Sequence, residues 1–282
     1  MKIKSLFLLG LSAVALASCG GVKEPNAYKN EVKKDDFLAK FQEKTKDNIL
    51  FHSSDEGKEP FSFVCEAEGS ESNLDVSLKG DKEYGKVTSE IENKSSIKYD
   101  LSSKVGEQVY EEKTNRKGDK EKTESVDKSH VFMKLDSGFS VQIDELAKTF
   151  KKSEAPKEDT EKQFFQNVYS QIKYMISSVE SKAALADEEE TKFYIDGDVF
   201  TFVIEEKDAI EEMKYSMSSS YLYQIALNGD SFEYFYKYDS VESYETRREE
   251  EHSLDHAVIS KKDVSVKAPD TSKYLDITPE AK

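Results

Sequence analysis

The sequence predicts an α+β fold in which a curved antiparallel β-sheet, a half-barrel-like meander, carries two central amphipathic helices packed on one face. Three observations lead to this prediction. Apolar residues alternate with polar residues from about 61 to 136, they recur at helical spacing between 143 and 179, and the alternation returns from about 191 to 266. A period of two residues is typical of strands with one buried face, and a period near 3.6 is typical of amphipathic helices.

Charge and composition limit the classes of protein to which this chain can belong. It has 282 residues, with 57 Asp and Glu against 41 Lys and Arg, and a net charge of −16. This balance argues against a nucleic-acid partner, because the phosphate backbone attracts clustered Lys and Arg. It also argues against attachment to anionic lipid through a basic patch. Hydrophobic residues make up 37% of the chain, which is enough to build the core of one domain.

The first nineteen residues carry the pattern of an export signal. Lys2 and Lys4 make a short basic start, and an apolar run follows from Ser5 to Ala17. A run of about thirteen residues is too short to span a bilayer as a helix. The run ends in the small residues of Leu16-Ala17-Ser18-Cys19, which are typical of a cleavage site. Residues 1–18 are therefore predicted to be a signal peptide.

The tetrad Leu16-Ala17-Ser18-Cys19 resembles the bacterial lipobox, the substrate motif of lipoprotein signal peptidase. The resemblance implies a diacylglycerol cysteine at Cys19, cleavage before that residue, and acylation, for example by palmitate, of the new amino terminus. Two or three acyl chains hold a protein on a membrane durably, whereas one chain does not. We therefore expect a lipid anchor on the extracytoplasmic or periplasm-facing side of a cell membrane.

A tether and one domain are expected to follow the anchor. Residues 19–34 lack periodicity and contain Gly, Pro and charged residues, which is typical of a flexible tether. A single domain is predicted over 35–270, with a C-terminal tail over 271–282. Cys65 is the second of two cysteines and cannot form an internal disulfide if Cys19 is acylated, so its thiol is expected in the core.

The domain is predicted to begin with a short helix and to continue as strands. Asp36 is a candidate N-cap, with Leu38 and Phe41 facing inward. Gly-Ser, Gly-Asp and Asn-Lys pairs are expected to separate the strands, and the polar residues 111–128 are expected to form a long solvated hairpin tip. The buried face should hold the apolar residues found at every second position, namely Phe61, Phe63, Cys65, Leu74, Val76, Leu78, Ile97, Tyr99, Leu101, Val131, Met133 and Leu135.

Two helices are predicted next, and both are expected to pack on the sheet. A short amphipathic helix is indicated by four residues at i, i+3, i+4 and i+7, namely Ile143, Leu146, Ala147 and Phe150. Thr160 and Gln163 have the spacing of a capping box at the start of a longer second helix. The apolar stripe of this helix consists of Phe165, Val168, Ile172, Met175, Ile176 and Val179.

The last part of the domain is predicted to contain two tight hairpins. Asp196-Gly197 and Asn228-Gly229 both suit type I′ turns, which need positive φ. The first hairpin groups Phe193, Phe200, Phe202 and Ile204 on one face. The second hairpin places Tyr238 on the same face as three expected cross-strand pairs, which are Tyr221–Tyr236, Tyr223–Tyr234 and Ile225–Phe232.

No motif for catalysis, a cofactor or a metal stands out. Glycine-rich nucleotide loops and the nucleophile elbow G-x-S-x-G are absent from the sequence, so the protein is predicted not to be an enzyme and to use no cofactor. His252, Asp255 and His256 have a spacing that could bind zinc, but the glutamate of H-E-x-x-H is missing. We therefore predict no metal site and keep a hydrolase only as a third class of function.

The order of the predicted elements is similar to that of the half-barrel lipoprotein carriers of the LolA and LprG/LppX type. In that group a curved antiparallel sheet and its helices enclose an apolar cavity for lipid. The resemblance implies that a lipid or another amphiphile binds between the sheet and the helices. The candidate lining comes from the aromatic hairpin and the long helix stripe, and consists of Tyr221, Tyr223, Tyr234, Tyr236, Tyr238, Phe165, Ile172 and Met175.

Two alternatives stay open at this point. The aromatic residues of the hairpin can instead be cross-strand pairs of a solid core, since such pairs stabilise sheets. In that case the protein would be a structural or adhesive envelope protein with a protein or glycan partner. The sequence does not determine the ligand, the envelope type or the oligomeric state.

Overall fold

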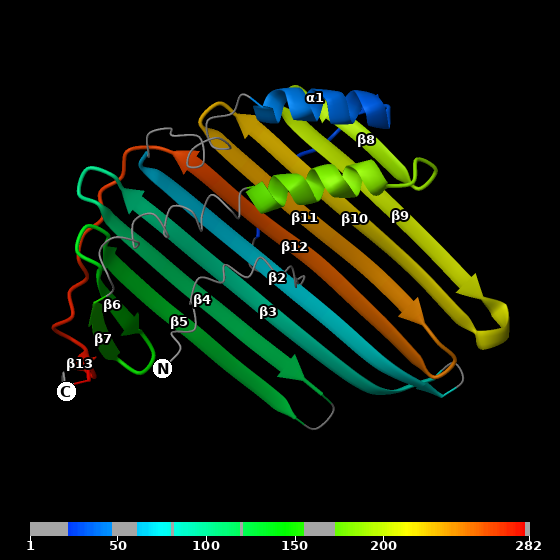
Figure 1. Cartoon of the computed structure of the whole chain (residues 1–282). Helices are drawn as coiled ribbons and strands as arrows, with labels where there is room; N and C mark the ends of the chain where they lie inside the picture. The colour runs from blue at the N-terminus through cyan, green and yellow to red at the C-terminus, as the bar shows by residue number, and fades with distance from the viewer. Residues whose placement is uncertain (1–21, 47–60, 80–81, 119–120, 155–172, 280–282) are drawn as a thin grey trace.

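One open, curved β-sheet forms the body of the protein (Figure 1). The structure, a computed structural model, describes residues 22–46, 61–79, 82–118, 121–154 and 173–279. Within these residues thirteen strands belong to a single sheet, and two α-helices lie on its concave face. The predicted antiparallel sheet is confirmed, but the fold is β-dominant rather than an even α+β mixture, because strands far outweigh helices.

The strands follow one another as two meanders. The first consists of β2–β7, which are Phe63–Lys79, Lys82–Asp100, Val105–Lys117, Lys122–Lys134, Phe139–Asp144 and Thr149–Glu154. The second consists of β8–β12, which are Thr191–Asp196, Val199–Ile210, Tyr215–Asn228, Ser231–Ser243 and Arg247–Lys261. Helix α1 (Lys34–Lys46) precedes the first meander, a helix over 173–185 precedes the second, and the 3-10 turn η2 (Glu211–Met213) joins β9 to β10. β12 pairs with β2, so the two meanders join in the middle of the sheet.

Both edges of the sheet end in very short strands from the two ends of the chain. β1 (Glu31–Val32) pairs antiparallel with β8, and β13 (Leu275–Asp276) pairs parallel with β7. An edge strand of two residues offers few free N–H and C=O groups to another sheet. The cover is partial, because β8 pairs only with Val199–Ile204 of β9 and β6 pairs only with Ser129–Lys134 of β5.

β2 and β3 are longer than the sequence pattern indicated. Gly69-Ser70 and Asn93-Lys94, which were expected to separate strands, lie inside β2 and β3. Gly69 provides space there, because a Cβ atom at this position would lie 2.7 Å from Oδ1 of Asp255. The predicted polar hairpin over 111–128 is confirmed as the paired outer ends of β4 and β5.

The core lies where the helices cover the sheet. Phe37 and Phe41 of α1 are fully buried. The Phe37 ring packs with centroid distances of 5.2 to 5.9 Å against Phe193, Phe200 and Phe202. The helix over 173–185 adds Met175, Ile176, Val179 and Ala183 to the same core. Cys65 is buried there as a free thiol, in agreement with its predicted place.

The start of α1 differs from the predicted cap. The prediction of Asp36 as N-cap is wrong, because the helix begins at Lys34 and Asp35 and Asp36 lie in its first turn. There the two carboxylates are favoured by the positive end of the helix dipole, which explains why two acidic residues occur at this position. Leu38 is only partly buried at the margin of the core.

The predicted helix over 143–150 is wrong, because this segment is the β6–β7 hairpin. Ile143 and Phe150 are cross-strand partners in the hairpin, so they share a face without helical winding. The Asp144 carboxylate accepts a hydrogen bond from the backbone N–H of Leu146 (2.9 Å), as expected of an Asx turn. Ile143 and Phe150, seven positions apart, are therefore brought together by a hairpin turn and not by two turns of a helix.

Both predicted aromatic hairpins form, each with a register two residues from the predicted one. The loop residues are Gly197-Asp198 and Gly229-Asp230, with φ of 64° and 52° at the glycines. Glycine occupies the first loop position, where a type II′ turn needs positive φ. Because the shift is an even number of residues, each side chain keeps its predicted face. The observed pairs are Tyr221–Tyr238, Tyr223–Tyr236, Ile225–Tyr234 and Leu227–Phe232.

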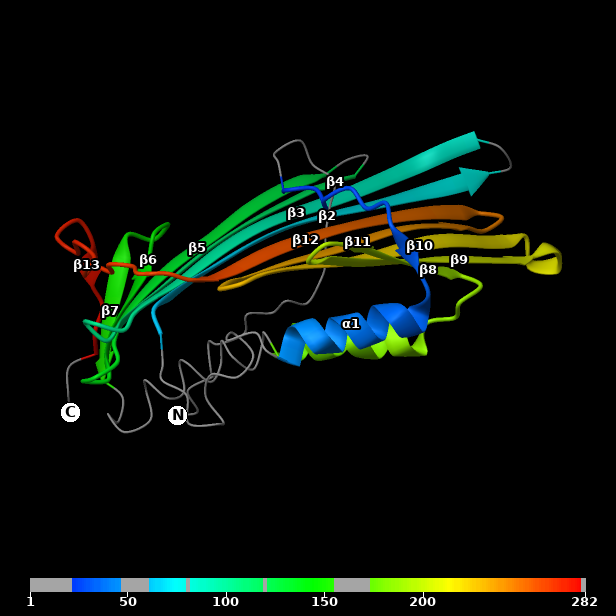
Figure 2. The same cartoon turned by 90° about the horizontal axis from the view of Figure 1, so that it is seen from above.

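The chain joins the sheet earlier than residue 35. Residues 22–32, named the N-terminal strap, run across the convex face of the sheet, opposite the helices (Figure 2). The Asn26 N–H donates to Oε1 of Gln224 (2.7 Å), and Nε2 of Gln224 donates to the Asn26 carbonyl (2.8 Å). The predicted tether over 19–34 is therefore wrong from residue 22 on, because side chains of the sheet bind the strap backbone.

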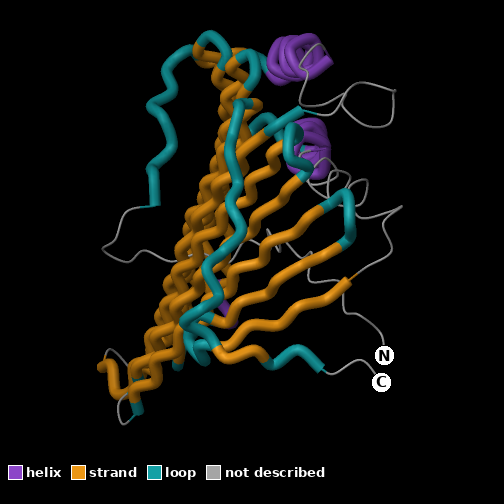
Figure 3. The backbone as a smooth tube through the Cα atoms, turned by 90° about the vertical axis from the view of Figure 1, so that its left-hand side faces the viewer, coloured by secondary structure: helices purple, strands orange, loops and turns teal. Residues whose placement is uncertain are grey.

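The predicted C-terminal tail over 271–282 is also attached in its described part. The Ile277 N–H donates to the Phe150 carbonyl (2.9 Å), next to the β13–β7 pairing. The Tyr274 hydroxyl donates to Oε2 of Glu145 (2.8 Å). These bonds place the last described residues along β7, at the edge of the sheet opposite to β1 and β8 (Figure 3).

Several predicted features lie outside the described residues. They are the signal peptide over 1–18, Cys19, the capping box of Thr160 and Gln163, and the lining residues Phe165 and Ile172. Of the helices that the structure describes, neither combines the length and apolar character that a membrane span requires.

Replacing Phe37 by Ala should loosen α1 from the sheet. Phe37 is 0% exposed and its ring contacts three phenylalanines of the sheet, and loss of a buried Phe ring costs about 3–5 kcal/mol. Urea unfolding followed by circular dichroism should show this loss. The control Lys40→Ala, on the exposed side of α1, should change the free energy of unfolding by less than about 0.5 kcal/mol. Equal stability of Phe37→Ala and the wild type would contradict the described packing.

Candidate functional site

The five tyrosines of the predicted lining lie together on the concave face. Tyr221 and Tyr223 belong to β10, and Tyr234, Tyr236 and Tyr238 belong to β11. The ring centroids of Tyr221 and Tyr238 are 4.7 Å apart, and those of Tyr223 and Tyr236 are 5.0 Å apart. Tyr223 also stacks on a phenylalanine of the core at 4.7 Å. This tyrosine cluster therefore extends the core along the strands.

Burial favours the protonated form of the hydroxyls of four of the five tyrosines, as their raised pKa values show. Burial raises the pKa of Tyr221 to about 12. It also raises the pKa values of Tyr223, Tyr234 and Tyr236 above the ordinary value. A protonated hydroxyl can both donate and accept a hydrogen bond. The cluster thus combines apolar ring faces with uncharged polar groups across the physiological pH range.

Two carboxylates are buried beside the tyrosine cluster. Asp255 of β12 lies opposite Tyr236 on one side and Gly69 on the other. Glu71 of β2 follows two residues after Gly69, on the same face. Asp255 and Glu71 are only 8% and 5% exposed. We name these two residues the buried acidic pair.

Burial dominates the electrostatics of the buried acidic pair. It raises the pKa of Asp255 to about 7, and the nearby Glu71 charge adds to the rise. Burial also raises the pKa of Glu71, although the Asn73 amide, which donates to Oε1 (2.6 Å), acts in the opposite direction. Oε2 of Glu71 has no hydrogen-bond partner among the described residues. A buried oxygen without a partner is a position that a ligand donor would stabilise.

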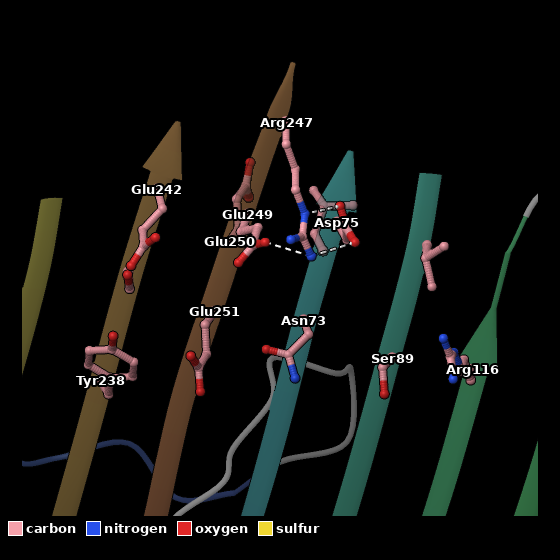
Figure 4. A pocket seen from close by; sticks show the side chains of 13 residues that line it. Asn73, Asp75, Ser89, Arg116, Tyr238, Glu242, Arg247, Glu249, Glu250 and Glu251 are labelled. Carbon is pink, nitrogen blue, oxygen red and sulfur yellow. Dashed lines mark hydrogen bonds and ion pairs between the residues drawn. The ribbon is translucent and has the colours of Figure 1, made fainter. Parts of the chain in front are cut away.

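An open groove of about 360 Å³ continues from the tyrosine cluster toward the far ends of the strands (Figure 4). Tyr238 lines both, so the groove and the tyrosine cluster form one surface. The Arg247 guanidinium binds both oxygens of Asp75 (3.0 and 2.9 Å) and contacts Glu249 at 2.6 Å. The charged lining consists of Asp75, Glu242, Glu249, Glu250 and Glu251 against Arg116 and Arg247. Its formal charge is therefore negative.

The convex face has a different charge pattern. Across β2–β5, acids and lysines on neighbouring strands form ion pairs, with nitrogen–oxygen distances of 3.7, 3.0 and 2.7 Å for Lys94–Glu68, Lys98–Glu107 and Lys128–Glu111. Because side chains alternate between the two faces of a strand, the registers place a group of acids on the concave face beyond the helices. These are Glu71, Asp75, Glu112, Asp127, Glu242, Glu249, Glu251 and Asp255. The acidic surplus of the described sheet thus lies mainly on the concave face.

The three residues with zinc-like spacing do not converge. β12 is a strand, so His252 and His256 lie on the convex face while Asp255 lies on the concave face. His256 binds Glu68 (3.2 Å) and Glu233 (2.8 Å) through its two ring nitrogens. Within the described residues, no group of three His, Cys, Asp or Glu side chains is placed to hold a metal ion.

The interface between the helices and the sheet is filled by core side chains. Met175, the described helix residue of the predicted lining, is 4% exposed and packs in that core. A second groove, of about 290 Å³, lies between the two helices, where it is lined by residues such as Gln42, Thr45, Ile176 and Glu180. The predicted lining therefore divides into a packed part under the helices and a tyrosine part beyond them.

Neither residue of the buried acidic pair was predicted from the sequence as part of a site. Asp255 occupies an inward position of β12, where alternate residues are Ser253, Asp255, Ala257 and Ile259. A carboxylate in an inward register is the signal that could have identified it. Glu71 was missed because the segment around Gly69 and Ser70 was interpreted as a turn, which hid the register of β2.

Comparison with known proteins gives no family. No protein-family description matches the chain, and no curated protein sequence matches it. Among solved structures it is similar to an outer membrane channel from Pseudomonas putida F1, with 9% identity, a TM-score of 0.23, and coverage of 74% of this chain and 98% of that chain. It is also similar to the translocator domain of the autotransporter NalP from Neisseria meningitidis, with 7% identity, a TM-score of 0.16, and coverage of 81% and 96%. Likenesses with such TM-scores carry no argument about this chain.

The contribution of Asp255 to the stability of the protein should fall as the pH rises from about 4 to about 7. Asp255 has a pKa of about 7 in the folded protein, against about 3.9 in an unfolded chain, so the folded state binds the extra proton in this window. Below pH 4 the group contributes no difference, and above pH 7 its buried charge lowers the free energy of unfolding by at most about 4 kcal/mol.

Urea unfolding of Asp255→Asn and the wild type at pH 4.5 and pH 8 measures this effect. The variant should be the more stable protein at pH 8, and its advantage should shrink at pH 4.5. Asp136→Asn, in the exposed turn after β5, is the matched control. An advantage of Asp255→Asn that is the same at both pH values would show that the carboxyl does not titrate in this range.

Proposed function

We propose that this protein is a non-catalytic lipoprotein of the cell envelope, anchored through acylated Cys19, that binds a cationic amphiphile on the concave face of its sheet. The observation that carries the ligand class is the position of the buried acidic pair beside the tyrosine cluster. The ligand would bind on the open face rather than under the helices, because core side chains pack under the helices.

An amine or a quaternary ammonium group matches the chemistry of this surface. The faces of aromatic rings attract cations, and Tyr236 lies directly opposite Asp255. A buried carboxylate without a counter-charge is unfavourable, so a bound cation would stabilise Asp255 and Glu71 in their ionised forms. The ring faces of the stacked pair Tyr221 and Tyr238 offer apolar contact to a chain attached to the cation. An anionic headgroup would instead meet repulsion from both carboxylates.

The proposed membrane anchor would bring the protein near a supply of amphiphilic ligands. The lipobox-like tetrad ends at Cys19, and multiple acyl chains would hold the protein at a membrane surface, where amphiphiles are abundant. A carrier or sequestering role needs only binding and release. We therefore propose no catalytic residues, no cofactor and no metal for this function.

A second candidate is a structural or adhesive role with a protein partner. The groove of about 360 Å³ supports it, because this groove is open, acidic and continuous with the tyrosine cluster. A basic, extended segment of a partner protein would fit such a surface through Lys and Arg side chains. The same binding experiment separates the two candidates, since only the first requires a small amphiphile to bind.

The first experiment is native mass spectrometry of residues 20–282, titrated with dodecyltrimethylammonium and with dodecyl maltoside as its neutral counterpart. The cationic amphiphile should bind more tightly, and more tightly at pH 8 than at pH 5, because the pKa of Asp255 is about 7. Asp255→Asn should weaken binding about tenfold, equivalent to about 1.4 kcal/mol. Asp239→Asn, on the convex face of the neighbouring strand, should leave binding unchanged. Equal binding of both amphiphiles, or none, would contradict the proposed ligand class.

The anchor is tested separately by metabolic labelling with an alkyne analogue of palmitate. In bacteria that express the full chain, the label should be found on the mature protein and should be lost in Cys19→Ser. Cys65→Ser is the control, since this thiol is buried and has its pKa raised to about 12 by burial. Labelling that persists in Cys19→Ser, or that is absent from the wild type, would overturn the anchor.

A further inference from the structure

The N-terminal strap is fixed to the middle of the convex face by side chains of the sheet. Gln224 is 0% exposed, and its amide forms two hydrogen bonds with the backbone of Asn26. The same amide donates to Oγ1 of Thr201 (2.9 Å), which holds it in this orientation. The Lys29 N–H donates to Oδ2 of Asp196 (2.7 Å). The strap therefore has a defined path across β11, β10, β9 and β8.

Lys23 is held at the beginning of this path. Its backbone N–H donates to Oε1 of Glu68 (3.0 Å), and its ammonium group binds Oε1 of Glu233 (2.5 Å). His256 bridges the same two carboxylates, and the ammonium group lies 5.4 Å from the centroid of the Phe235 ring. Charge-assisted bonds to partly buried carboxylates are stronger than exposed ion pairs. Lys23 is thus fixed above β11, β12 and β2.

Only four residue steps separate Lys23 from Cys19. An extended chain covers at most about 3.6 Å per residue, so the two Cα atoms can be no more than about 14 Å apart. Glu68 lies five residues from the start of β2 and eleven from its end, which corresponds to about 17 and 36 Å. β11 is the fifth strand from the β1 edge, which places that edge about 19 Å away at a strand spacing of about 4.8 Å.

The connection to Cys19 is therefore shorter than the distance from Lys23 to the near margins of the sheet. If Cys19 carries the acyl chains, they attach over the convex face around Lys23 and not at an edge or an end of the sheet. We infer that the protein lies with its convex face toward the lipid headgroups and presents its concave face to the surroundings. This inference rests on the acylation of Cys19 that the proposed function contains.

The charges of the two faces agree with this orientation. The convex face around Lys23 carries lysines paired with acids, such as Lys94–Glu68 and Lys98–Glu107. The concave face carries the buried acidic pair and the acidic groove. A membrane surface with anionic lipid repels acidic groups within about a Debye length, roughly 8 Å at physiological salt. The convex face is thus the side with the smaller electrostatic cost of lying on such a surface.

Two adjacent reporter positions on one strand test the orientation. Lys94 and Ser95 of β3 lie on the convex and the concave face, one strand away from Glu68. The full-length lipidated protein carrying Lys94→Cys or Ser95→Cys is labelled with a fluorophore and inserted into phosphatidylcholine vesicles. These vesicles contain a lipid with a nitroxide on its headgroup. Quenching at position 94 should exceed quenching at position 95 at least twofold. Equal or reversed quenching in protein that is bound to vesicles would overturn the orientation.

A spacer variant tests whether the short connection between Cys19 and Lys23 sets the orientation. Insertion of twenty Gly and Ser residues between Gly21 and Val22 keeps Cys19 and the strap contacts but removes the short connection. In this variant the quenching at positions 94 and 95 should become equal, while the protein stays on the vesicles. If unequal quenching persists, the short connection does not set the orientation and the inference fails. If the wild-type protein fails to bind vesicles through Cys19, the anchor itself fails, which is a distinct result.

Discussion

The structure depends on a difference in length between the sheet and the helices that cover it. β2 has 17 residues and α1 has 13, which correspond to about 56 Å of strand and about 20 Å of helix. One layer of helices can therefore exclude water from only part of the concave face. β11 follows this limit, because its inward positions change from Phe232 under the helices, through Tyr234, Tyr236 and Tyr238, to Ser240 and Glu242 beyond them. Tyrosine suits the margin, since its ring packs on the core while its hydroxyl contacts polar groups.

The same limit explains why two carboxylates lie buried in a protein without a visible counter-ion for them. Asp255 and Glu71 lie beside the tyrosine cluster, in line with Tyr236 and Tyr238, where neighbouring side chains remove water but no lysine or arginine of the described chain pairs with them. Asn73 satisfies one oxygen of Glu71, and the space left by Gly69 accommodates Asp255. On the convex face, where water is present, similar acids are paired with lysines and histidines. The same strands therefore carry unpaired carboxylates on the concave face and paired carboxylates on the convex face.

Much of the sheet could be predicted from the sequence, because alternation depends only on one face being buried. The face of every tyrosine in the aromatic hairpin was predicted correctly, although the register was two residues off, since turn type depends on which loop position the glycine occupies. The helix predicted over 143–150 was wrong because a hairpin also brings Ile143 and Phe150 to one face. The strap and Asp255 were missed for a different reason. Their roles depend on residues some 200 positions away, such as Gln224 for Asn26, and no local pattern reports such partners.

The pairing of β12 with β2 has a consequence for how the chain reaches its final shape. These strands lie at opposite ends of the domain, and their pairing extends over fifteen residue pairs from Arg247–Ser77 to Lys261–Phe63. During synthesis or export, the first meander emerges with one long side of β2 lacking its partner until the last long strand arrives. Non-local pairing of this kind is slow and leaves strand edges exposed in the meantime. A chain that ends before β12 would keep the unpaired sides of both β2 and β11, and it would be prone to join other chains edge to edge.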